Sequence, residues 1–226
     1  MGKRIIEILR YLIECVIEVV YPSENICLIC SKLLDGEELL CLSCADKIKS
    51  CKESFLISRN GVSVVNYSAA YYTNVITELI IRLKYKGDFR CGEALGALMF
   101  DVIKEKQIDF DLIAFVPMKA KEFKRRGYNQ SEYLARLIGK STKIPVCNTL
   151  IKMKESKDQI GLDGLLRWEN LKGCFIAVNT KEIKDKKILL VDDVITTGAT
   201  GFYCASELLF EGAKEVTILT GAKSSI

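Results

Sequence analysis

Short aliphatic runs alternate with segments of helical periodicity through most of this chain. The run at 187–191 has the length and composition of a buried strand, and the apolar spacing at 202–210 is typical of a helix. The other expected elements, in chain order, are a strand or hairpin at 61–72, helices at 76–83 and 94–103, a strand at 111–116, a helix from about 131 to 138, and strands at 174–178 and 216–219. We therefore predict an α/β fold.

The first part of the chain has a different pattern. Its apolar run at 5–20 is interrupted by Glu7, Arg10, Glu14 and Glu18 at spacings of three and four residues. Such spacing places the charges on one side of an amphipathic helix. Because four charges within 16 residues disfavour a transmembrane span and a signal peptide, we expect residues 1–22 to form a docking helix of a cytoplasmic protein.

Two cysteine pairs follow this helix. Cys27 and Cys30 form one C-x₂-C pair, and Cys41 and Cys44 form a second pair after ten intervening residues. Two such pairs can complete a tetrahedral four-sulfur site, which is structural because no coordination position stays open. We expect a zinc-binding lobe at 23–55, with an iron–sulfur cluster or four reduced cysteines as the alternatives. The chain contains no histidine, which excludes His-based catalytic triads and zinc sites that need imidazole.

The sequence VDDVITTGAT at 191–200 joins a predicted strand to a predicted helix. Ligands of α/β proteins bind at this kind of junction, and the free N–H groups of a helix N-terminus suit a phosphate. Gly198 lets the loop close around the phosphate, and Asp192 and Asp193 suit the vicinal hydroxyls of a sugar or a hydrated Mg²⁺. A ribose 5-phosphate fits this arrangement. We do not expect a receiver domain, because only 33 residues follow Asp193, nor a Walker-type loop, because no Walker lysine is present; an accidental polar turn is the alternative.

A basic stretch supports an anionic ligand. Residues 111–160 carry 11 Lys/Arg against 5 Asp/Glu, whereas the whole chain has a net charge of +4. Phe123 and Tyr128 lie among these cations, a mixture suited to single-stranded nucleic acid. The alternative is a solvated lysine-rich surface. The residues that we assign to nucleic-acid contact are Lys121, Lys124, Arg125, Arg126 and Tyr128.

The polar segment 152–173 is predicted to be a mobile lid that brings Arg167 or Lys157 to a leaving pyrophosphate. A passive connection or a short helix is the alternative.

The motif at 191–200 resembles the phosphoribosyl-pyrophosphate (PRPP) motif of type I phosphoribosyltransferases. The order of the cysteine pairs, LKYKGD, VPMK, KRRGYNQ and VDDVITTGAT is similar to that of the ComF family of competence proteins, over essentially the whole chain. This resemblance implies a type I phosphoribosyltransferase-like fold, with a mainly parallel central sheet flanked by helices at 56–226 and a zinc-binding lobe before it.

The resemblance also implies roles for individual residues. Asp192 and Asp193 would contact the ribose hydroxyls, and Thr196, Thr197, Gly198, Ala199 and Thr200 would enclose the 5-phosphate. The pyrophosphate loop would consist of Pro117, Met118 and Lys119, with Arg125, Arg126, Asn129 and Gln130 just beyond it. Gln159, Arg167 and Asn170 would belong to the flexible loop. The family often has Thr-x-x-Gln before this loop, whereas this chain has Glu155-Ser156-Lys157-Asp158-Gln159, so the chemistry of the loop stays open.

Two functions follow from these expectations. The first is a phosphoribosyltransferase-like protein that binds PRPP with Mg²⁺ and uses Asp192, Asp193, Lys119 and Arg167 in pentosyl transfer. The second is an accessory protein of DNA uptake that binds single-stranded DNA beside a helicase-like partner without turning over PRPP. The two are compatible, and the acceptor substrate cannot be identified from any motif.

Overall fold

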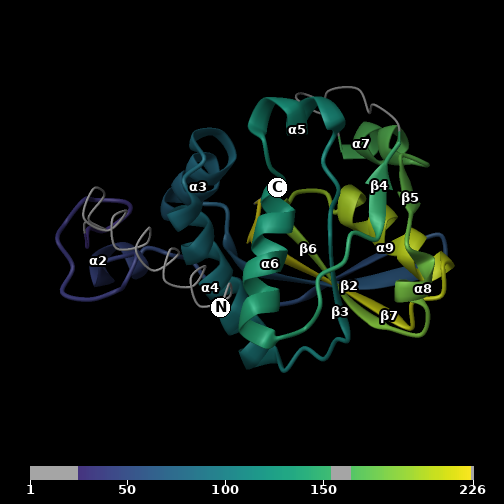
Figure 1. The fold of residues 1–226 in the computed structure, drawn as a ribbon, viewed down its shortest axis with the longest axis horizontal. Coiled ribbons are helices and arrows are strands. Elements are labelled where there is room, and N and C mark those ends of the chain that lie inside the picture. Colours follow the sequence, from purple (N-terminus) through teal and green to yellow (C-terminus); the bar gives the residue numbers. More distant parts are fainter. Residues whose placement is uncertain (1–24, 154–163, 225–226) are drawn as a thin grey trace, which may run out of the picture.

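The structure is a computed structural model that describes residues 25–153 and 164–224. The predicted α/β fold is confirmed: five strands form a central sheet in the order β1-β2-β7-β6-β3 (Figure 1). Only the β1–β2 pair in this sheet is antiparallel. The strands are β1 (Phe55–Arg59), β2 (Val62–Tyr71), β3 (Leu112–Phe115), β6 (Lys187–Ile195) and β7 (Glu215–Lys223).

The centre of the sheet is apolar because helices cover both of its faces. On one face, Leu189 and Val191 of β6 pack against α3 (Asn74–Ile81), α4 (Phe89–Lys106) and α6 (Gln130–Thr142). On the other face, Ile188 and Leu190 pack against α9 (Ala199–Phe210). Two antiparallel strands, β4 (Leu150–Lys152) and β5 (Phe175–Ala177), form a separate small sheet.

Strand β6 is longer than predicted. The predicted strand ends at Val191, but β6 continues to Ile195 and pairs with β7 up to the Ile195–Lys223 register. Asp192 and Asp193 are therefore strand residues, and placing them in the turn was wrong. Since successive side chains of a strand point to opposite faces of its sheet, this correction separates the two carboxylates.

Other elements differ from the prediction in their extent. The break expected at 84–88 is mostly a π-helix, η1 (Arg82–Lys86), which ends at Gly87 with a φ of 65°. The sequence pattern missed β1, β4 and α5 (Ala120–Arg126). Within the predicted lid, residues 164–171 form α7, which matches the short-helix alternative. Residues 154–163, with Lys157 and Gln159, lie outside the described residues. A short α8 (Thr180–Ile183) precedes β6.

The cysteine lobe lies at one end of the molecule, beyond α3 and α4 (Figure 1). It contains a bridge between Ile26 and Leu33 and the short helix α2 (Leu42–Ala45). Leu28 links the lobe to the main domain, since its side chain joins the core on the α3–α4–α6 face. The amphipathic helix predicted at 1–22 falls outside the described residues. Among the helices of 25–153 and 164–224, none combines the length and apolarity that crossing a membrane requires.

Candidate functional site

The loop between β6 and α9 has the geometry of an anion site. Gly198 caps α9 with a φ of 80°, and a Cβ there would lie 2.8 Å from the side chain of Ile57. Both the backbone conformation and the packing therefore require glycine. The first N–H groups of α9 have no carbonyl partner within the helix, and the helix dipole is positive at this end.

One hollow connects this loop with the end of the sheet. Its lining includes Asp192 of β6, Thr220 of β7 and Leu171 of α7. Every residue predicted to enclose a 5-phosphate also lines it: Thr196, Thr197, Gly198, Ala199 and Thr200. The hollow thus combines one carboxylate, several hydroxyls and a helix N-terminus, which together suit a phosphorylated sugar.

Asp192 is the acid of this hollow, and it is half-buried. Its Oδ1 accepts hydrogen bonds from the hydroxyl of Ser131 at 2.7 Å and from the N–H of Asp193 at 2.9 Å. Burial raises the pKa of Asp192 most, the neighbouring charge of Asp193 raises it further, and the result is about 7. A sugar hydroxyl or a cation that stabilised the charged carboxylate would therefore bind with favourable free energy.

The first turn of α6 positions Ser131. Asn129 caps this helix: its Oδ1 accepts the N–H of Ser131 at 3.0 Å, and its Nδ2 donates to the carbonyl of Val116 at 2.9 Å. Asn129 of the KRRGYNQ segment is thus the N-cap of α6. The cap ties α6 to the end of β3, and so it fixes Ser131 against Asp192.

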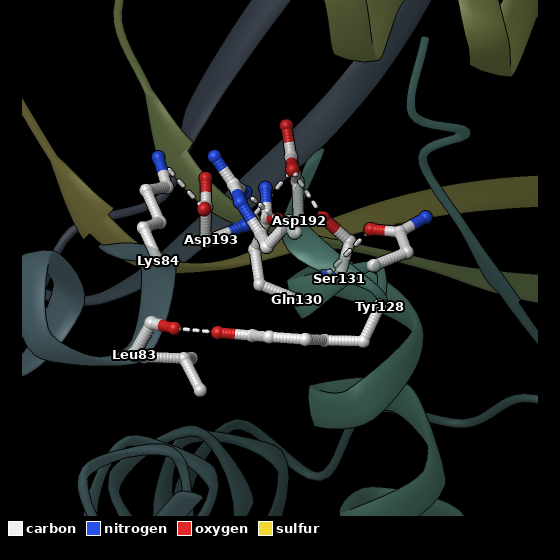
Figure 2. A network of polar contacts seen from close by, with 9 residues as sticks. Leu83, Lys84, Tyr128, Gln130, Ser131, Asp192 and Asp193 are labelled. Atoms are coloured by element: carbon white, nitrogen blue, oxygen red, sulfur yellow. Dashed lines mark hydrogen bonds and ion pairs between the residues drawn. The ribbon is translucent and has the colours of Figure 1, made fainter. Parts of the chain in front are cut away.

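Asp193 points away from the hollow. Its side chain is on the side of the sheet covered by α3, α4 and α6, and the residue is only 4% exposed. Lys84 of η1 lies 2.7 Å from it, measured from Nζ to Oδ2 (Figure 2). Burial, the largest single effect, lowers the pKa of Lys84, but the charge of Asp193, its hydrogen bond and the charge of Asp192 together outweigh burial, and the pKa is raised overall. The structure thus pairs Asp193 with a lysine that the sequence analysis had not assigned to the site.

A second set of contacts joins η1 to the segment before α6 (Figure 2). The hydroxyl of Tyr128 donates to the carbonyl of Leu83, and its ring centroid lies 5.0 Å from that of Phe89. Arg126 donates to Gln130 and lies 5.5 Å from the ring centroid of Tyr85. Tyr128 therefore contributes to packing between η1 and α6, and it is half-buried.

The basic loop begins at the end of β3, next to β6, because Phe115 pairs with Val191. Pro117, Met118 and Lys119 are half-buried in this loop. Beyond them, Lys121, Lys124 and Arg125 are exposed on α5, and Phe123 is 47% exposed between them. Of the four cations that we assigned to nucleic-acid contact, all except Arg126 therefore form an accessible surface on α5.

Lys152 at the end of β4 is a further cation that the sequence analysis missed. Its Nζ lies 5.1 Å from the ring centroid of Phe175. Burial lowers its pKa most, and the like charge of Lys119 lowers it further. Two lysines that repel each other in this way would both be stabilised by an anion between them. Arg167 belongs to α7, but its side chain lies outside the described part of the structure.

The four predicted cysteines form one cluster. The Sγ atoms of Cys27, Cys30, Cys41 and Cys44 all lie within 4.8 Å of one another, and those of Cys30 and Cys41 are 3.6 Å apart. A tetrahedral zinc with Zn–S bonds of about 2.3 Å would hold its sulfurs about 3.8 Å apart, so the donor set fits zinc.

The electrostatics of the cluster also favour a cation. Burial raises the pKa of Cys27, but backbone N–H groups lower it by more, and the balance is about 6. Burial and the three neighbouring thiols raise the pKa of Cys44 to about 12. Four crowded thiols cannot all ionise by themselves, whereas a divalent cation stabilises all four thiolates.

The chain is similar to competence proteins and to DNA utilization proteins. It is 31% identical over 155 residues to competence protein F of Haemophilus influenzae, covering 66% of this chain and 68% of that protein. It is 27% identical over 169 residues to competence protein ComFC of Streptococcus pneumoniae, covering 74% and 71%. It is 25% identical over 207 residues to DNA utilization protein YhgH of Escherichia coli, covering 86% and 88%. No protein-family model matches the chain.

Solved structures with a similar arrangement include two proteins of phosphoribosyl chemistry. Glutamine PRPP amidotransferase from B. subtilis matches 58% of this chain, which spans about a quarter (26%) of that protein, with 23% identity and a TM-score of 0.41. Purine phosphoribosyltransferase from Pyrococcus horikoshii matches 59% of this chain and 75% of its own, with 18% identity and a TM-score of 0.35.

Proposed function

This chain belongs to the ComF family of competence proteins, and from that premise we propose that it binds PRPP, or a related phosphorylated ribose, with Mg²⁺ in a DNA-uptake role. The observation that carries this proposal is the hollow at the end of β6. It is lined by Asp192, by the threonine loop and by the N-terminus of α9. Each part complements one part of a phosphorylated pentose.

The 5-phosphate would bind at the β6–α9 loop. The N–H groups of the first turn of α9 and the hydroxyls of Thr196, Thr197 and Thr200 would donate to its oxygens. Asp192 would accept from a ribose hydroxyl, since its carboxylate is oriented toward the same hollow by Ser131. Charge-assisted hydrogen bonds of this kind are shorter and stronger than neutral ones.

The pyrophosphate would bind over the basic loop. Lys119 and Lys152, whose charges repel each other, would share its negative charge together with the backbone of Pro117 and Met118. Arg125 lies near the end of α5, and Arg167 is assigned to the same role from the family resemblance. Mg²⁺, held mainly by ligand oxygens and water, would supply further positive charge at the pyrophosphate.

The reaction that suits such a site is pentosyl transfer. The bond from C1 of the ribose to the pyrophosphate oxygen breaks, pyrophosphate leaves with the electron pair, and an acceptor nucleophile forms the new bond to C1. Asp192 would hold the ring, and the lysines would stabilise the charge that develops on the leaving group. Positioning and electrostatics would thus supply the rate enhancement, as neither step needs a protein nucleophile.

Calorimetric titration with PRPP and Mg²⁺ tests this proposal. We expect binding by the wild-type chain and a loss of at least about tenfold in affinity for Asp192→Asn, which removes one charge-assisted hydrogen bond. Asp101→Asn is the matched control, because Asp101 is an exposed acid on α4 whose side chain is 66% exposed. Absence of binding by the wild type, or equal binding by Asp192→Asn, would refute the site.

The exposed face of α5 favours a second candidate function, the binding of single-stranded DNA. Lys121, Lys124 and Arg125 can neutralise phosphates, and Phe123 can stack on a base between them. In DNA uptake, such a surface would pass the incoming strand to a helicase-like partner. Fluorescence anisotropy with a labelled oligonucleotide at several salt concentrations tests it, because phosphate contacts weaken steeply as salt rises.

The cysteine cluster would hold a structural zinc ion. Its four thiolates leave no open position for a substrate, so the metal would stabilise the lobe and take no part in transfer.

A further inference from the structure

Helix η1 brings a buried cation to the acidic pair. Lys84 Nζ lies 2.7 Å from Asp193 Oδ2, and the two side chains are 22% and 6% exposed. An ion pair with so little access to water depends strongly on both partners, because removing one leaves the other as an uncompensated buried charge. The pair joins residues 109 positions apart, so it links two separate motifs of the chain.

The backbone that carries Lys84 is fixed from two directions. Tyr128 donates to the carbonyl of Leu83, the residue just before Lys84, and so connects η1 to the segment that leads into α6. Arg82 pairs with Asp88 across the end of the π-helix. Single π-helical turns occur frequently at functional sites. Here the turn determines where the ammonium group of Lys84 lies (Figure 2).

The position of Lys84 separates the two acids electrostatically. Asp192 faces the hollow, whereas Asp193 lies on the opposite face of the sheet with its charge balanced by Lys84. The charged groups that act on Asp192 are Asp193 on its own strand and Lys84 on η1, and the neutral thiol of Cys204 on α9 also lies near it. Without Lys84, the uncompensated charge of Asp193 would repel both Asp192 and an anionic ligand.

We propose that Lys84 is a positioning residue of the ligand site: it holds and neutralises Asp193, so that Asp192 alone presents a carboxylate to the phosphorylated ribose. This inference rests on the proposed function and deepens it. It gives different roles to the two adjacent acids of the motif: Asp192 contacts the ligand, and Asp193 pairs with Lys84. Lys84 acts mainly through Asp193, adds its own charge near Asp192, and is not itself a ligand contact.

A double-mutant cycle with PRPP and Mg²⁺ tests the proposal. Lys84→Met should weaken PRPP binding about tenfold, since it leaves the charge of Asp193 uncompensated near the site. Adding Asp193→Asn to Lys84→Met should then restore most of the lost affinity. If affinity stays low in the double variant while stability recovers, Lys84 does not act on the ligand site through the charge of Asp193, and the proposal fails.

Thermal melting of the same variants, without ligand, tests the pairing independently. Lys84→Met should lower the melting temperature by roughly 5–10 °C, and the double variant should recover much of this loss. The exposed pair Lys104 and Asp101 gives the matched control cycle, in which the two substitutions should add.

Additive effects of Lys84→Met and Asp193→Asn, in melting or in affinity, would overturn the proposal. An unstable Lys84→Met chain would not block this test. In that case the double variant is compared with Asp192→Asn, and equal losses of affinity in the two would contradict the assignment of Asp192 as the ligand acid. A wild-type chain that fails to bind PRPP would overturn the proposed function instead, and the melting cycle would still decide whether the pair is coupled.

Discussion

The side chain of Ile57 occupies the space that a Cβ on Gly198 would need, with Cδ1 only 2.8 Å from that position. Ile57 belongs to β1, so the edge strand of the central sheet supports the loop that begins α9. The tight loop thus depends on a contact between segments 141 residues apart.

Gly198→Ala should therefore damage both stability and phosphate binding. The substitution forces a side chain into the left-handed region and against Ile57, at a cost of about 1–3 kcal/mol in free energy of unfolding. Denaturant unfolding and PRPP titration measure the two effects. Gly173→Ala is the matched control: Gly173 also has a positive φ, 66°, but no atom lies within 4 Å of the position that a Cβ would take there, so this variant carries the strain without the clash. Equal effects of the two substitutions would contradict this account of the loop.

The raised pKa of Asp192 predicts how stability changes with pH. Its pKa is about 7 in the folded chain against 3.8 as the ordinary value, so the folded state binds this proton more tightly than the unfolded state does. The ionised carboxylate therefore destabilises the fold, and this cost grows from about pH 4 to pH 7 and then levels off.

Asp192→Asn should remove that cost. Its melting temperature relative to wild type should be higher at pH 8 than at pH 5, when both proteins are measured without ligand. A difference that stays constant across this range would show that the carboxylate is not desolvated in the folded chain.

The cysteine cluster predicts one zinc per chain. Cys44→Ser should lose the metal and destabilise the lobe, since it removes one of four ligands around a closed site. Elemental analysis of the purified protein measures the metal, and melting with and without a chelator measures its effect. Cys147→Ser should keep the zinc, because Cys147 lies outside the cluster. Iron in place of zinc would favour the iron–sulfur alternative.

The α5 surface predicts a measurable change in DNA binding. Replacing Lys121 and Lys124 by Gln should weaken binding to a single strand and reduce the slope of log affinity against log salt by roughly 1.4, about 0.7 for each lost phosphate contact. Lys140→Gln with Lys181→Gln is the control, because both lysines are exposed but lie on α6 and α8. An unchanged slope in the α5 variant would contradict a DNA path over this helix.

Local patterns in the sequence predicted much of the molecule. The aliphatic run before Asp192 predicted a buried strand, and the C-x₂-C spacing predicted the cluster of four cysteines. Each of these signals is contained in a short stretch of the chain. The hydrophobic pattern could not predict that β6 continues through two acids to Ile195. That extension depends on pairing with β7 and on the neutralisation of Asp193 by Lys84.

Several contacts at the site could not be predicted, for a similar physical reason. Tyr128 was assigned to base stacking because its neighbours in the chain are basic. Its hydroxyl partner is a backbone carbonyl 45 residues away, at Leu83, which no periodicity or spacing indicates. Lys84 and Lys152 were missed for the same reason, since each lies on an element that is far from the acidic motif in the sequence.

A crystal structure of the chain with PRPP and Mg²⁺ tests the central claim most directly. We predict the 5-phosphate at the N–H groups of the first turn of α9, with Asp192 against a ribose hydroxyl and Asp193 still paired with Lys84. A ligand bound elsewhere, or a 5-phosphate that makes no contact with residues 196–200, would contradict it.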